Sequence, residues 1–121
     1  MKSKDSALIR MANKPDTDLT DKEGYVAEYN GGLQLSGGTN ALGIITEGGK
    51  TESDIVILGT YGGTVRAKAS GTVTVGKKVI VDAAGKIKDL SSTGTVIGVA
   101  LESGVADELV EIAPMQPVVV A

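Results

Sequence analysis

The sequence predicts a mainly β fold: a small β-barrel or β-sandwich-like domain with an extended, flexible N-terminal arm. Short runs of β-branched residues recur from residue 25 onward, and glycine-rich turns separate them. No segment with helical periodicity exceeds about ten residues. The length of 121 residues suits one domain. We therefore expect an arm over residues 1–23 and a single β-rich domain over residues 24–121.

The arm differs from the rest of the chain in its charge. Residues 1–23 carry five basic and five acidic residues, so their net charge is zero. Asp5 or Ser6 can cap a helix that begins at Ala7, but Pro15 would end it after about two turns. A helix of that length is not stable alone, so an extended or disordered arm is expected. An unstructured terminus without function is the alternative.

Two strands are expected in the first half of the domain, at Leu42–Ile45 and at Ile55–Leu58. Both are apolar runs bounded by turn residues. The turns are marked by Gly-Gly pairs at 31–32, 37–38, 48–49 and 62–63.

The second half predicts a central hairpin. Val73 and Val75 alternate with threonine, which is typical of a strand, and Val79–Val81 follows after Gly76. Asp82–Gly85 then suits a tight loop, because aspartate can bond its own backbone and glycine tolerates positive φ.

The closing strands are expected at residues 95–101 and 109–112. Ile97, Val99 and Leu101 would share one face by the period of two. The other face is small at Val96, Gly98 and Ala100, so it would allow close approach of a backbone or of a tightly packed second sheet. Beyond residue 112, prolines 114 and 117 are expected to interrupt regular pairing before the final valine run.

The core must be aliphatic, because the chain has no Phe and no Trp and only three Tyr. Buried aromatic side chains normally contribute large apolar areas. Val, Ile, Leu and Ala must replace them here. Such a core predicts additional burial against another subunit.

Composition excludes several classes of partner. The net charge of −3 and the estimated pI of about 4.9 argue against nucleic acid, which requires a basic face. The sequence has no apolar run of the roughly 18 residues that a membrane-spanning helix needs, and no signal peptide is visible. Cysteine is absent, which is compatible with a reducing cytoplasm.

The sequence also lacks the usual chemistry of catalysis. Without His or Cys it has no imidazole base, no thiolate nucleophile and none of the usual transition-metal ligands. The acids of the domain stand mostly beside turns, where surface charge is the ordinary explanation: Asp82, Asp89, Glu102, Asp107 and Glu108. We predict no catalytic residue, cofactor, metal or small-molecule substrate. An enzyme with carboxylates in an intersubunit cleft is an alternative, although no acid pair can be nominated.

Two motifs only approach known binding sites. Gly49-Lys50-Thr51 resembles the end of a phosphate-binding loop, but position 44 is Ile instead of Gly, and a strand-like run follows. Residues Asp16, Asp18 and Asp21 have a partial calcium-like spacing, without the glycine and glutamate that an EF-hand needs.

Residues 65–79 resemble the strand-turn rhythm of biotinyl or lipoyl carrier domains. Such domains modify one lysine at a hairpin tip, flanked by Met or Asp-Ala. Lys68 stands in a strand-like context and has neither flank. A carrier domain modified on Lys68 is therefore kept as an alternative function.

The segments 94–102 and 107–112 resemble the closing part of the capsid cement, or head decoration, proteins of tailed bacteriophages. Residues 71–87 resemble the central hairpin of the same lambda-like family. The likeness covers roughly residues 40–113 and contains no catalytic signature. It implies a mostly β structural protein that is not an enzyme.

The resemblance further implies a homotrimer that binds the major capsid protein on the outside of the head and stabilises the shell. The protein would be made in the host bacterial cytoplasm and end on the virion surface. The arm would add a strand to a sheet of the coat protein. Its only apolar cluster is therefore the candidate capsid-binding site: Ala7, Leu8, Ile9 and Met11.

Overall fold

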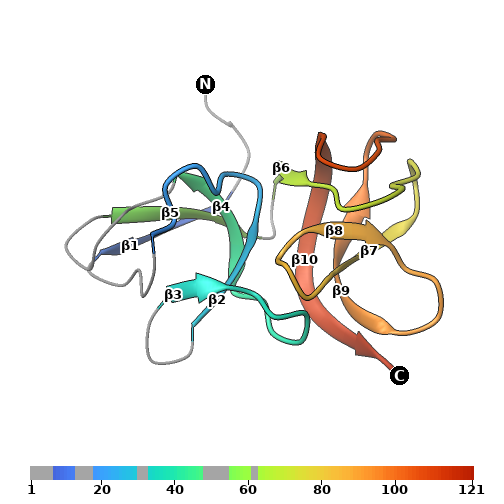
Figure 1. Ribbon diagram of the computed structural model, residues 1–121, viewed down its shortest axis with the longest axis horizontal. Helices are drawn as coiled ribbons and strands as arrows, with labels where there is room; N and C mark the ends of the chain where they lie inside the picture. The colour runs from blue at the N-terminus through green and yellow to red at the C-terminus, as the bar shows by residue number, and fades with distance from the viewer. Residues whose placement is uncertain (1–6, 13–17, 30–32, 48–54, 61–62) are drawn as a thin grey trace.

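The computed structural model of the chain is built from β-strands (Figure 1). It describes residues 7–12, 18–29, 33–47, 55–60 and 63–121. These residues contain no helix, and so none that could cross a membrane. Within these described ranges, ten strands form two five-stranded antiparallel sheets. The predicted mainly β class is confirmed, and the sheets stay open instead of closing into one barrel.

The first sheet comes from the N-terminal half and has the order β1-β5-β4-β2-β3. Its strands are β1 (Ala7–Ala12), β2 (Val26–Tyr29), β3 (Leu33–Leu35), β4 (Gly43–Glu47) and β5 (Ile55–Thr60). The strands predicted at 42–45 and 55–58 are therefore present as β4 and β5.

The second sheet comes from the C-terminal half and has the order β6-β10-β9-β7-β8. Its strands are β6 (Val65–Lys68), β7 (Lys78–Val81), β8 (Ile87–Asp89), β9 (Gly94–Ala100) and β10 (Leu109–Val120). Figure 1 shows the two sheets as neighbouring halves of the molecule, with β10 on the side of its sheet that faces the first sheet.

One aliphatic core joins the two sheets. Val26 and Ile44 of the first sheet belong to the same buried cluster as Val79, Ile97 and Ile112 of the second. Fully burying a side chain of this size contributes about 1.5–3 kcal/mol. The predicted aliphatic core is confirmed in the described residues.

A second, smaller cluster lies within the first half. Leu19 is fully buried there with Ala27 and Ile45, and Tyr25 packs against them. Residues just before 24 thus contribute to packing. The domain boundary placed after residue 23 stays a prediction.

The hairpin between β7 and β8 forms as predicted. Asp82 Oδ1 accepts hydrogen bonds from the backbone N–H of Ala84 (2.8 Å) and of Lys86 (3.0 Å). Gly85 takes a φ of 81°, which an L side chain rarely adopts. The local chemistry of the loop therefore determines its shape.

The strand predicted around Val73 and Val75 is wrong. Val73 makes only an isolated bridge to Gly104, and Val75 is exposed. The N–H of Val75 donates instead to the side-chain oxygen of Ser103 (3.0 Å). At Val75 a hydrogen bond to a loop side chain therefore takes the place of pairing with a neighbouring strand.

The single face predicted for Ile97, Val99 and Leu101 is also wrong. The β7–β9 ladder shifts register, so that Val79 pairs with Gly98 and Ile80 pairs with Val96. Ile97 is the extra residue, and a bulge reverses the alternation of side chains beyond it. Consequently Ile97 and Ala100 share the main core, whereas Leu101 is exposed.

Strand β10 is longer than predicted. Its pairing with β9 is interrupted between Pro114 and Val118, as the prolines led us to expect, but it resumes through Val120. The prolines therefore produce an irregularity within one strand of 12 residues instead of ending it.

Candidate functional site

The predicted binding cluster lies on β1. Its four residues belong to the segment Ala7–Ala12, which pairs antiparallel with Ile55–Thr60 of β5. The extended conformation expected for this part of the arm is confirmed. Helix formation there would forfeit six residue pairs with β5, which explains why the strand is preferred over the short capped helix.

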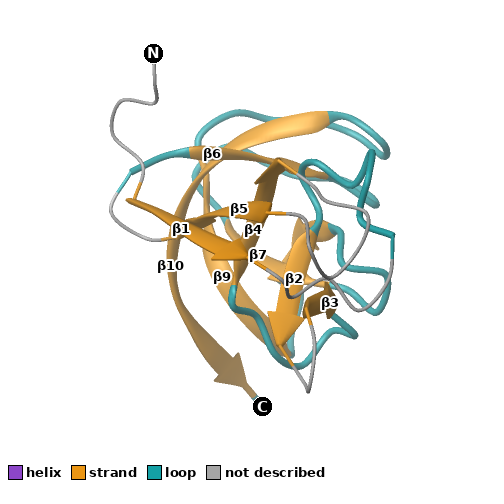
Figure 2. Cartoon of the chain, turned by 90° about the vertical axis from the view of Figure 1, so that its left-hand side faces the viewer, coloured by secondary structure: helices purple, strands orange, loops and turns teal. Residues whose placement is uncertain are grey.

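Strand β1 lies at the edge of the first sheet. It ends the strand order of its sheet, so no described strand pairs with its outer side. Unpaired N–H and C=O groups along such an edge can accept a further strand from another chain. Figure 2 shows β1 beside β5 at this boundary of the sheet.

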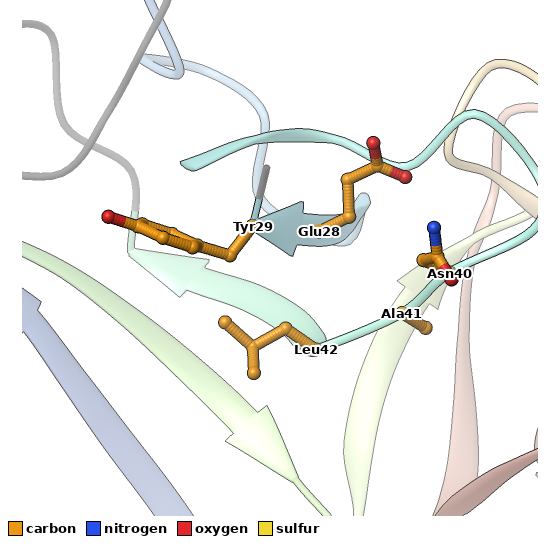
Figure 3. Close-up of a pocket in the computed structure, with 5 residues that line it drawn as sticks. All are labelled: Glu28, Tyr29, Asn40, Ala41 and Leu42. Carbon is orange, nitrogen blue, oxygen red and sulfur yellow. The ribbon is translucent and has the colours of Figure 1, made fainter. Parts of the chain in front are cut away.

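A shallow hollow lies beside β2 and the residues that precede β4 in the same sheet, and its volume is about 240 Å³ (Figure 3). It is lined by Glu28, Tyr29, Asn40, Ala41 and Leu42. The Tyr29 ring and the Leu42 side chain form its apolar side, and both are partly exposed.

The carboxylate of Glu28 is already used to hold the surrounding loop. One oxygen accepts a hydrogen bond from Gln34 Nε2 (2.8 Å), and the other accepts from the N–H of Gly37 (3.2 Å). A carboxylate bound in this way orders the β3–β4 loop. Among the described residues no second carboxylate lines the hollow, so these residues do not supply the acid pair that general acid–base catalysis uses.

A charged network surrounds Tyr25 on the surface. The Nζ atoms of Lys22 and Lys86 lie 5.1 Å and 5.7 Å from the centre of its ring, within cation–π range. Lys86 Nζ also lies 3.1 Å from Asp107 Oδ1. The hydrogen bond to Asp107, followed by the charge interaction with Tyr25, raises the pKa of Lys86. The lysine stays charged, which fits a structural contact.

The described titratable groups contain one further resolved shift, at Asp82. Its partial burial acts to raise the pKa, but hydrogen bonds from Ser70 and from the N–H groups of Lys86 and Ala84 outweigh that effect. The net result is a pKa below the ordinary value. This is the pattern of a carboxylate that stabilises a turn, whereas a general acid would need a raised pKa.

Lys68 does not occupy the position that a carrier domain requires. It ends strand β6, where it pairs with Leu109 of β10. Its backbone N–H donates to the carbonyl of Gly24 (2.7 Å). A modified lysine needs a projecting hairpin tip, so this geometry gives the carrier alternative no support.

The described part of the chain contains no group of three or more acidic, His or Cys side chains arranged to hold a metal. Asp18 Oδ1 accepts from the N–H of Thr20 (2.9 Å), as in a local turn. Asp16 and the phosphate-loop-like residues 49–51 lie outside the described residues.

No protein-family model and no curated protein sequence matches this chain. Its structure is similar to the crystal structure of the head fiber gp8.5 N base of bacteriophage phi29. The TM-score is 0.68 at 14% sequence identity, and the match covers 95% of each chain. The chain therefore shares its overall fold with that fiber base, and its described residues form an open, two-sheet β protein.

Proposed function

We propose that the protein is a non-enzymatic structural component of a phage virion. In this proposal it forms a homotrimer on the outside of the head, binds the major capsid protein and stabilises the shell. The observation that carries the proposal is the fold likeness to a phage head fiber base over 95% of both chains. The sequence resemblance of residues 71–87, 94–102 and 107–112 to head decoration proteins supports it independently.

The open edge of β1 suits the proposed contact with the coat protein. Main-chain hydrogen bonds along an added strand supply affinity without requiring a deep pocket. A contact through one short edge strand is weak, because only a few main-chain hydrogen bonds join the two chains. Three linked copies raise the effective concentration of the remaining strands, so a trimer would hold the shell firmly.

The charge of the protein is consistent with this location. An outer cement protein contacts other proteins and needs no basic face for DNA. The net charge of −3 agrees with such a role.

Cosedimentation with expanded empty capsids of the cognate phage tests the proposal. The wild-type protein is expected to sediment with the capsids. Deleting residues 1–12 removes β1 but keeps the buried Leu19, so the variant should remain folded and lose at least ten-fold in affinity.

A deletion of residues 1–5 provides the matched control, because it shortens the terminus and leaves β1 in place. Circular dichroism verifies that both variants are folded. A wild-type protein that stays in the supernatant at micromolar concentration would refute the capsid function. Equal binding by both deletions would refute the role of β1.

A further inference from the structure

The second half of β10 is an unusual surface for an isolated subunit. Strand β6 pairs only with residues 109–112 of β10. Beyond them, β10 pairs with β9 alone, so no described strand covers its other edge. In Figures 1 and 2 this part of β10 runs out toward the C-terminus, away from β6.

The exposed edge is strongly apolar. Met115 is 36% exposed, Val118 is 49% exposed and Val119 is 69% exposed. Exposure is also continuous, since every residue from 115 to 119 is exposed and the alternation seen at the start of β10 is lost. Gln116 is the polar member of this run, and the other four residues are apolar. Exposed apolar residues on both faces of a strand are normally avoided unless they serve a contact.

The segment is nevertheless a defined strand. Val118, Val119 and Val120 pair in register with Val96, Thr95 and Gly94 of β9. On one face, Val118 lies opposite the buried Val96. Pairing with β9 therefore fixes the conformation of this apolar surface before any partner binds.

We propose that residues 113–120 form the contact between copies of this chain, packing against the same segment of the other subunits around their symmetry axis. This inference rests on the proposed trimer and adds the location of its interface. The same interface would supply the additional burial against another subunit that the small aliphatic core predicts.

A second copy is the occupant that the chemistry favours. Residues 112–121 contain no charged side chain, although 22% of the whole chain is charged. An uncharged aliphatic surface is complementary to its own copy, whereas a patch of one charge would repel its copy. Interfaces between identical subunits are also more apolar than those with transient partners.

The prolines make a closed assembly the expected form. Pro114 and Pro117 lack backbone N–H groups, so they leave gaps in any ladder along this segment. Association through side chains is then favoured over open-ended addition of strands. Packing around an axis closes the interface and limits the number of subunits.

The first test compares charged substitutions at exposed valines. Light scattering should give a trimer mass for the wild type and a three-fold lower mass for the double variant Val118→Asp, Val119→Asp. Val105→Asp is the matched control, because Val105 is 59% exposed but lies in the loop before β10. Circular dichroism should show the same fold for all three proteins. A monomeric wild type, a trimeric double variant or a monomeric control would overturn the inference.

Cysteine cross-linking provides a readout that does not depend on disrupting the interface. The chain has no cysteine, so Val119→Cys introduces a single thiol. Mild oxidation should convert this variant into a covalent dimer, because a disulfide forms when two Cβ atoms lie about 4 Å apart. The Val105→Cys variant should remain uncross-linked. Equal cross-linking at both positions, or none at Val119→Cys, would contradict the proposed interface.

The same samples separate this inference from the capsid function. A wild-type trimer that cross-links at position 119 but ignores capsids would refute the capsid function and retain the interface. A protein that binds capsids while its double variant stays trimeric would retain the function and refute the interface.

Discussion

At the scale of single residues, close backbone packing explains why position 98 is a glycine. An added Cβ on Gly98 would lie 2.7 Å from the carbonyl oxygen of Ala113 and 3.2 Å from the Cα of Pro114. Both neighbours belong to β10, so the close approach of a backbone expected for this segment is present at Gly98, whereas Ala100 packs in the main core with Ile97. Gly98 allows β9 and β10 to approach where the ladder changes register.

Gly98→Ala is expected to destabilise the protein by about 1–3 kcal/mol, because backbone atoms must move to accept the methyl group. Gly71→Ala is the matched control, since nothing lies within 4 Å of its Cβ position. Urea unfolding at fixed protein concentration measures both. Equal midpoints for the two variants would contradict the packing explanation.

Asp82 predicts how stability depends on pH. Because its pKa is lowered in the folded state, it contributes stability that is present above the unfolded value of about 3.9. That contribution is lost as the pH falls through the folded pKa. Asp82→Asn should therefore be less stable at pH 7 and should lose less stability between pH 6 and pH 3 than the wild type. Urea midpoints across this range measure the difference, and parallel pH profiles would contradict it.

At the scale of elements, hydrogen bonds from loops connect the two sheets. The N–H of Val26 in β2 donates to the carbonyl of Gly85 at the tip of the β7–β8 hairpin (2.7 Å). The hydroxyl of the buried Thr95 in β9 donates to the carbonyl of Thr39, which precedes β4 (3.0 Å). Each contact joins a strand of one half of the chain to a loop of the other half, in addition to the shared apolar core.

Thr95→Val should lower stability by about 1–3 kcal/mol, because it leaves the carbonyl of Thr39 without this donor. Thr95→Ser keeps the hydroxyl and should cost about 0.8 kcal/mol for the lost methyl group. Urea unfolding distinguishes them. A valine variant as stable as the serine variant would show that the hydrogen bond contributes little.

At the scale of the whole molecule, the two sheets offer two different edges. The edge of β1 lies in the N-terminal sheet, and the second half of β10 lies at the edge of the C-terminal sheet. In the proposed assembly the first contacts the coat protein and the second contacts the other subunits. Affinity for the shell would then depend on subunit association, as in other multivalent systems.

The sequence by itself determined the β class, the strands β4 and β5, the Asp82–Gly85 hairpin and the aliphatic nature of the core. It also singled out residues 7–11 as an apolar segment, although it did not indicate β5 as their partner. These features depend on local propensity, on turn chemistry and on composition. Neighbouring residues are sufficient to specify them.

Only the tertiary structure decided the register and the exposure of the strands. The bulge at Ile97, the pairing of β1 with β5 and the continuation of β10 past Pro117 all depend on strands distant in sequence. A shift of one residue moves side chains to the opposite face, and no local pattern records which partner imposes it. The exposure of the end of β10 also depends on a distant strand, because β6 pairs only with residues 109–112 and is too short to cover the rest.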